Sequence, residues 1–134
     1  MLNKSKQIKY KKVRKGKLKK LEFKINCLKF GTYGLKAAES GIINSYQIEA
    51  ARQAISRKIK RKGKIWIRIF SDLPVTSKPT GVRMGNGKGP FLHWGVKIAQ
   101  GSILFEICAV SLNTIYLALK VGSAKLPIKT KICN

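Results

Sequence analysis

The glycine-rich stretch at residues 78–89 constrains the fold of this chain more than any other part of it. Glycine has no side chain to pack, and its backbone takes positive φ at little steric cost. A run of glycines disfavours a helix and makes a weak interior strand. After Lys78 the only charges in the stretch are Arg83 and Lys88, without any acid. The stretch therefore predicts a loop whose backbone can come close to a negatively charged partner; its glycines are Gly81, Gly85, Gly87 and Gly89.

The net charge narrows the kind of partner. Twenty-nine Lys and Arg against 5 Asp and Glu give +24 over 134 residues. A polyanion neutralises such a charge, and nucleic acid or an anionic membrane surface are the two candidates. We expect no membrane span, because no run of 18 or more apolar residues occurs. The length fits one domain. We expect residues 1–20 to form a basic arm and residues 21–134 to form this single domain, with its loop at 78–90.

The first 20 residues are dominated by cations. They contain no acid, and their few apolar residues are too sparse to form a helix face. Such a segment is typical of an arm that stays extended until it lies along a polyanion, although a solvated tail without a partner has the same composition. The cations are Lys4, Lys6, Lys9, Lys11, Lys12, Arg14, Lys15, Lys17, Lys19 and Lys20.

Two helices are predicted. Asn44 is a good N-cap, with Gln47 three residues on to reach back, and the apolar stripe that follows ends before Gly63. Ser111 opens the second helix. The stripe of the first helix is Ile48, Ala51, Ile55 and Ile59, and that of the second is Leu112, Ile115, Leu119 and Gly122.

Alternating apolar residues predict strands at 21–30, 35–38, 64–70 and 128–132. Gly31 and Gly34 bracket an expected turn, and residues 71–79 are expected to be a loop. Residues 91–99 and 102–109 are expected to pair as a hairpin around Gln100 and Gly101. Trp66, inside an alternating strand, is expected in the core. The pattern favours a two-layer α+β fold, with two helices packed on a largely antiparallel sheet and an extended basic N-terminal arm.

Catalytic chemistry has few suitable residues. The five acids are well separated in sequence, His93 is the only histidine, and the three cysteines form no Cys-x-x-Cys pair. The acids are expected to serve as ion-pair partners and the cysteines to be reduced. The glycine stretch lacks the Ser or Thr of a Walker loop and opens no helix. We therefore expect no catalytic site, metal, cofactor or small-molecule substrate.

Six blocks in order resemble one protein family. The chain is similar to large-subunit ribosomal protein sixteen, in its bacterial or organellar form, from about residue 11 to residue 130. The blocks are residues 31–36 (GTYGLK), 47–52 (QIEAAR), 63–68 (GKIWIR), 78–79 with 82–85 (KP, VRMG), 87–89 (GKG) and 124–130 (AKLPIKT).

The resemblance implies a two-layer α+β domain that is not an enzyme and that binds large-subunit rRNA, tRNA and neighbouring ribosomal proteins. It implies roles in late subunit assembly and in placing tRNA near the peptidyl-transferase centre. The loop facing tRNA and the catalytic centre corresponds to Arg83, Met84, Gly85, Asn86, Gly87, Lys88 and Gly89. The rRNA-binding arm of the family corresponds to the ten cations of residues 1–20. Like charges that crowd the end of the first helix repel unless an anion lies against them, so we also expect that helix to bind rRNA, through Arg52, Arg57, Lys60, Arg61 and Lys62.

Two positions depart from the family pattern. Asn86 stands where lysine is usual, and residues 112–114 lack the acids that normally open the second helix. The composition, poor in acids and rich in Lys, Ile and Asn, suggests an A·T-rich organellar gene. We therefore expect a mitochondrial ribosome in the matrix and an organelle-encoded protein, with a plastid or the bacterial cytoplasm as the alternative. A free sequence-specific RNA- or DNA-binding regulator is the alternative function.

Overall fold

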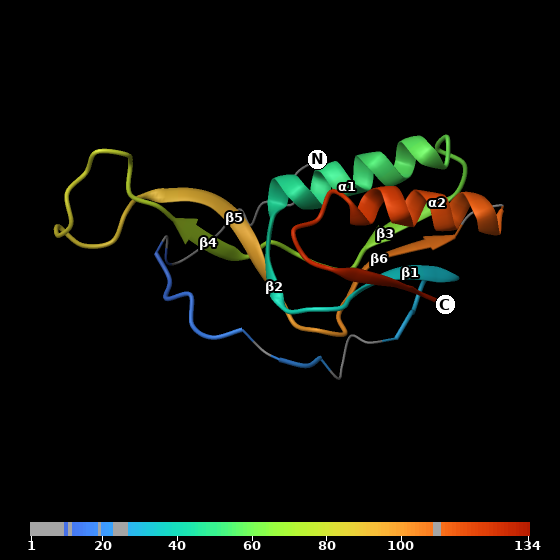
Figure 1. Ribbon diagram of the computed structural model, residues 1–134, viewed down its shortest axis with the longest axis horizontal. Helices are drawn as coiled ribbons and strands as arrows, with labels where there is room; N and C mark the ends of the chain where they lie inside the picture. The colour runs from blue at the N-terminus through green and yellow to red at the C-terminus, as the bar shows by residue number, and fades with distance from the viewer. Residues whose placement is uncertain (1–9, 11, 19, 23–26, 109–110) are drawn as a thin grey trace.

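The computed structural model is an α+β fold of two helices and seven strands (Figure 1), and it describes residues 10, 12–18, 20–22, 27–108 and 111–134. The elements in chain order are β1 (Tyr33–Ala37), β2 (Gly41–Asn44), α1 (Ser45–Lys58), β3 (Lys64–Ile67), β4 (Leu73–Thr76), β5 (Phe91–Ile98), β6 (Ile103–Cys108), α2 (Leu112–Ser123) and β7 (Thr130–Cys133).

The strands form two sheets, and every pair of named strands is antiparallel. One sheet has the order β3-β6-β1-β7 and the other β2-β5-β4. The predicted hairpin is wrong, because β5 pairs with β2 and β4 whereas β6 pairs with β3 and β1. Between β5 and β6, Gly101 has φ 94°, and its N–H donates to the Ala37 carbonyl. The chain thus crosses from one sheet to the other where a local turn was expected.

Both helices lie side by side over the four-stranded sheet, and the core fills the space between the layers (Figure 1). The predicted stripe of α1 is confirmed, since Ile48, Ala51, Ile55 and Ile59 are all buried. Gln47 Oε1 accepts a 2.9 Å hydrogen bond from the Asn44 N–H, as the predicted cap requires. In α2 the buried side chains are Ile115, Ala118, Leu119 and Gly122, and Leu112 is 64% exposed, so its inclusion in the stripe was wrong.

Helix α1 ends earlier than Gly63 predicted. The last helical residue is Lys58, and Lys60 and Arg61 have φ of 52° and 62°. The Arg61 N–H donates to the Ser56 carbonyl and the Lys60 N–H to the Arg57 carbonyl, both at 3.1 Å. This is the hydrogen-bond pattern of a Schellman cap, in which glycine usually takes the left-handed position. Here a lysine occupies that position, at a steric cost.

Replacing Lys60 by glycine is expected to raise the free energy of unfolding by about 0.5–1 kcal/mol. Glycine removes the left-handed penalty at φ 52°, which outweighs the entropy that it adds to the unfolded chain. Urea unfolding of the full chain measures the change. Lys62→Gly is the matched control, since it removes the same charge and Lys62 is not among the residues with positive φ. A gain of equal size in both variants would attribute the effect to charge.

Three further expectations were wrong in detail. Tyr33 and Gly34 lie in β1 and not in a turn. Gly34 is needed for close packing, because a Cβ there would lie 2.5 Å from Leu28 Cδ2. The expected strand at 21–30 is absent from 21–22 and 27–30, where Leu21 makes a single bridge to Gln100; residues 23–26 lie outside the described part. The expected 71–79 loop contains β4, in which Pro74 is tolerated because β4 is a sheet edge.

The remaining strands agree more closely with the sequence. The strand predicted at 35–38 lies largely within β1. The strand predicted at 64–70 is shorter in the structure, where it is β3, and the strand predicted at 128–132 is found slightly later in the chain, as β7. Trp66 is half-buried and stacks on Phe30 at 6.2 Å between ring centroids, so it lies outside the hydrophobic core cluster in which it was expected. No helix in the described ranges is both long and apolar enough to cross a membrane.

Candidate nucleic-acid interface

The glycine-rich loop projects from the far end of the β4–β5 ladder, away from the helices (Figure 1). Residues 79–88 are exposed, and the Met84 side chain is 95% exposed. Gly81, Gly85 and Gly87 have positive φ, and no atom lies within 4 Å of a Cβ built on any of them. These glycines are therefore needed for backbone conformation. Gly89 has another role, because a Cβ there would lie 2.4 Å from the Ser77 carbonyl oxygen at the base of the loop.

Asn86 stands between two positive-φ glycines and itself has φ 52°. Asparagine is among the non-glycine residues that enter the left-handed region most readily, because its short polar side chain bonds locally. Lysine is less suited to that conformation. The structure thus gives a physical reason for asparagine at this position. Asparagine favours the left-handed backbone conformation at the loop tip, whereas a lysine would add a charge there.

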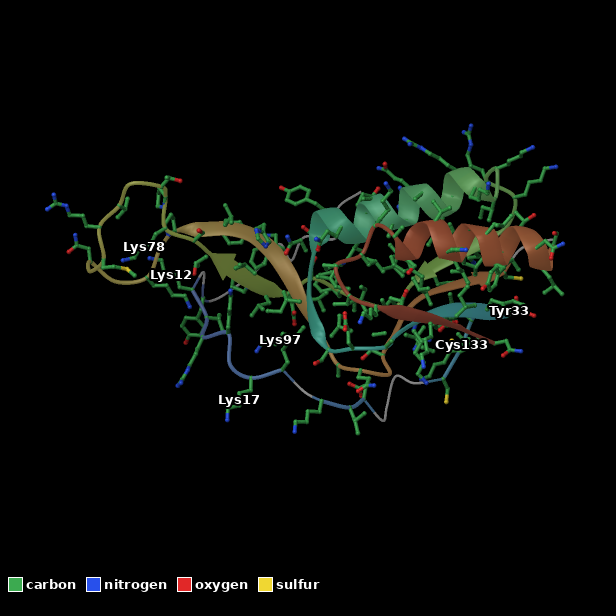
Figure 2. All side chains as sticks on the ribbon, in the orientation of Figure 1. Lys12, Lys17, Tyr33, Lys78, Lys97 and Cys133 are labelled. Atoms are coloured by element: carbon green, nitrogen blue, oxygen red, sulfur yellow. The ribbon has the colours of Figure 1, made fainter. Side chains whose placement is uncertain are left out.

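The loop's cations differ in what they contact. Lys78 Nζ donates to the Gly85 carbonyl at 2.6 Å, inside the loop. Lys88 Nζ donates to the Val13 carbonyl at 2.6 Å, and Lys12 Nζ donates to the Lys88 carbonyl at 2.8 Å. Figure 2 shows Lys12 and Lys78 together near the loop base. Lys12 and Lys88 thus join the loop to the arm, whereas the Lys78 contact stays within the loop.

Arg83 differs from these lysines. Its guanidinium is exposed and has no hydrogen bond or ion pair with any residue in the described ranges. Met84 beside it is nearly fully exposed. The side chains of Arg83 and Met84 therefore remain available to a partner.

The described part of the N-terminal arm is extended and exposed. It passes below the β4–β5 ladder, on the side opposite to the helices, and Lys17 points outward (Figures 1 and 2). Its described cations are Lys12, Arg14, Lys15, Lys17 and Lys20; Lys4, Lys6, Lys9, Lys11 and Lys19 lie outside the described residues. Between arm and body is a hollow of about 360 Å³ with Lys17, Lys97, Arg68 and Phe70 in its lining.

A second basic surface covers the C-terminal half of α1. Arg57, Lys60, Arg61 and Lys62 are exposed, and an open hollow of about 530 Å³ lies among Arg52, Gln53, Ser56, Arg57, Lys60 and Arg61. Arg52 differs from the others because its guanidinium binds both oxygens of Glu49, at 2.6 and 3.0 Å. The hydrogen bond from Arg52 lowers the pKa of Glu49. Among these five cations, Arg52 is thus the one with an ion pair inside the described residues.

The predicted binding residues do not form one cluster. The loop is at one end of the molecule and the C-terminus of α1 at the other, with the arm joined to the loop (Figure 1). The structure therefore presents two basic surfaces, one made of arm and loop and one made of α1. A partner that contacts both has to extend along the length of the domain.

The sequence predicted ion pairs for the acids, but it did not predict that Glu106 is fully buried and bound to backbone N–H groups. This acid is fully buried, its Oε2 accepts the N–H groups of Phe30 and Gly31 at 2.7 and 2.8 Å, and it pairs with Arg68. Burial by itself raises the pKa of Glu106, but the backbone N–H donors of residues 29–31 and Arg68 together lower it. Glu106 stands within the otherwise apolar, buried run of β6, and no local signal identified its partner.

The other candidates for chemistry lie apart. His93 is half-buried in β5, and the structure has no disulfide between Cys27, Cys108 and Cys133. Within the described ranges, no three His, Cys, Asp or Glu side chains meet in a way that fits a metal ion. The expectation that acids act as ion-pair partners is confirmed for Glu49 and Glu106.

Fold and charge together define a basic α+β protein with an extended arm and a glycine-rich loop, of the class that binds a polyanion. The chain belongs to the ribosomal protein L16p/L10e family, whose model matches residues 5–133. It is 59% identical over 104 residues to the large ribosomal subunit protein uL16 of Bartonella quintana, covering 78% of this chain and 76% of that protein. It is 49% identical to the uL16 proteins of Rhizobium etli and Caulobacter vibrioides, covering 94% and 95% of this chain and 92% and 89% of those proteins.

Membership of this family gives the chain a structural role in the large ribosomal subunit and not an enzymatic one. The expected mitochondrial location is contradicted. The relatives just named are bacterial proteins, and they point to a bacterial ribosome, which the composition argument had placed second. A lysine-rich, acid-poor composition is expected of any chain that binds a polyanion, so it does not identify a compartment.

Proposed function

We propose that this chain binds large-subunit rRNA through its arm and α1 surface, and that the loop tip contacts tRNA near the peptidyl-transferase centre and supports late subunit assembly. The observation that carries the proposal is the exposed, unpaired Arg83 on a projecting glycine-rich loop joined to a basic arm. Arginine binds phosphate in bidentate geometry, and glycines without bulk let a loop enter a narrow RNA crevice. No observation favours the alternative of a free sequence-specific regulator.

The two basic surfaces suit an RNA that extends past both ends of the domain. Exposed cations bind phosphates with the release of counterions, so affinity for rRNA is expected to fall steeply with salt, with a slope of about 0.7–0.9 per phosphate contacted. A native protein that migrates free of ribosomal particles on a sucrose gradient would contradict the proposal. Tight binding of the full chain to one defined oligonucleotide at physiological salt, with no preference for rRNA, would favour the regulator.

Replacing Arg83 by alanine is expected to weaken tRNA binding to particles reconstituted with the full chain by about ten-fold, because one charge-assisted phosphate contact is lost. The free energy of unfolding should change by less than about 0.5 kcal/mol, since Arg83 is exposed and lies outside the hydrophobic core cluster. Filter binding of tRNA and urea unfolding measure the two effects. Lys125→Ala, which removes an exposed cation outside the proposed surfaces, is the control. A loss of stability in Arg83→Ala that accounts for the lost binding would contradict the assignment.

A further inference from the structure

Helix α2 carries an exposed apolar face on an otherwise strongly basic protein. Leu112, Tyr116, Leu117 and Val121 are 64%, 58%, 47% and 40% exposed. They form two i,i+4 pairs that flank the exposed side chains of Asn113 and Lys120 along the solvent side of the helix. Four large apolar side chains together on one helix face are more than the scattered exposed apolar residues of ordinary surfaces.

The charge of this face contrasts with that of the neighbouring helix. Between residues 57 and 62, α1 and its cap carry Arg57, Lys58, Lys60, Arg61 and Lys62, whereas α2 has one cation, Lys120, in its twelve residues. Phosphates gain nothing from Leu112, Leu117 and Val121, so the face is poorly suited to an RNA backbone. Apolar side chains around one charge are instead typical of a protein–protein contact.

The surroundings of the face indicate what it would hold. A hollow of about 440 Å³ lies between α2 and β7, with Tyr116, Lys120 and Ile132 in its lining. Another, of about 500 Å³, lies between α2 and the end of α1; Thr114 and Leu117 line its α2 side, and the cations Arg57, Lys58, Lys60 and Lys62 line its α1 side. Lys120 makes no hydrogen bond or ion pair with the described residues. The helix thus forms an apolar ridge between two hollows, with an unpaired cation at its centre.

We propose that this face of α2 binds a segment of another protein in the same ribosomal particle, one that offers apolar side chains around a carboxylate opposite Lys120. The apolar partner side chains pack against the exposed leucine, tyrosine and valine side chains of α2, and the carboxylate pairs with Lys120. The inference rests on the proposed function in one respect, namely that the chain resides in a particle. It assigns to α2 a protein partner where α1 has an RNA partner.

The test places the photoreactive amino acid p-benzoylphenylalanine at residue 117, or at residue 53 on α1, in the full chain assembled into purified, salt-washed particles. The residue-117 adduct is expected to resist nuclease and to contain a segment of one other particle protein with Asp or Glu in it, identified by mass spectrometry. The residue-53 adduct is expected to be RNA. Lys120→Glu should reduce the residue-117 adduct about ten-fold, and the matched control Lys125→Glu should leave it unchanged within about two-fold.

Each other outcome has a defined meaning. An RNA adduct at residue 117, an adduct with a second copy of this chain, or no adduct while residue 53 yields RNA would overturn the inference and leave the proposed function intact. An equal effect of Lys120→Glu and Lys125→Glu would also overturn it. A chain absent from the particles would instead contradict the proposed function. Urea unfolding of the four variants shows whether each retains its fold.

Discussion

Replacing Glu106 by glutamine is expected to lower the free energy of unfolding by about 3–5 kcal/mol. The carboxylate is fully buried and accepts hydrogen bonds from three successive backbone N–H groups and from Arg68. A carboxamide offers one acceptor oxygen and turns its NH₂ group toward N–H donors, and it leaves the largely buried Arg68 charge without its partner. A loss of this size is a large part of the stability of a domain.

Glu49→Gln is the matched control for this substitution. Glu49 also pairs with an arginine, Arg52, but on the surface of α1, where the loss is expected to stay below about 1 kcal/mol. Urea unfolding of the two variants and the wild type at one salt concentration measures the difference. Equal losses in the two variants would show that the buried hydrogen bonds of Glu106 contribute no more than a surface ion pair.

The same carboxylate gives a pH dependence with a defined sign. The folded state lowers the pKa of Glu106 below its unfolded value, which is about 4.3. Its contribution to stability is therefore fully present above that pH and is lost as the pH falls through the folded pKa. The wild type is expected to lose stability in this acid range more steeply than Glu106→Gln does. Parallel acid-unfolding curves for the two proteins would contradict the expectation.

Replacing Gly122 by alanine is expected to destabilise the protein by about 1–3 kcal/mol. Alanine ordinarily favours a helix over glycine by up to about 1 kcal/mol. Here a Cβ would lie 2.6 Å from Ile55 Cγ1 and 2.7 Å from Ile55 Cδ1, where α2 packs on α1. Ile55 is fully buried, so it has no free space into which to rotate. The steric cost therefore exceeds the gain in propensity and reverses the usual sign.

A double-mutant cycle tests this cause. Ile55→Val, which alone costs about 0.5–1.5 kcal/mol, removes a methyl group from the contact, so it should cost less in the Gly122→Ala background. Thermal and urea unfolding of the four proteins give the coupling free energy. Val121→Ala, at the neighbouring exposed position, is the control and is expected to change stability by less than about 0.5 kcal/mol. Additive effects of the two substitutions would exclude the contact with Ile55 as the cause.

Local signals predicted the helices well, because their causes are local. The Asn44–Gln47 cap and the stripe of α1 depend on residues within a few turns of each other, and both are present. The end of α1 was missed because a lysine adopts the left-handed conformation that glycine usually takes. Strand existence was predicted better than strand pairing. The hairpin between β5 and β6 was wrong because two strand-like runs around a glycine turn do not specify their own pairing, and only the rest of the fold decides which partners they meet.

Within the candidate site, residues 78–89 also combine properties that the sequence predicted with contacts that only the structure showed. Alternate glycines and the absence of acid were enough to predict an exposed loop suited to an anionic partner, since both properties follow from the residues themselves. Only the tertiary structure showed that Lys88 is bound to the arm through Val13, that Arg83 remains unpaired, and that Asn86 fits a left-handed tip. The physical reason is that residues 13 and 88 meet through long-range folding, and sequence spacing carries no information about contacts made between distant segments.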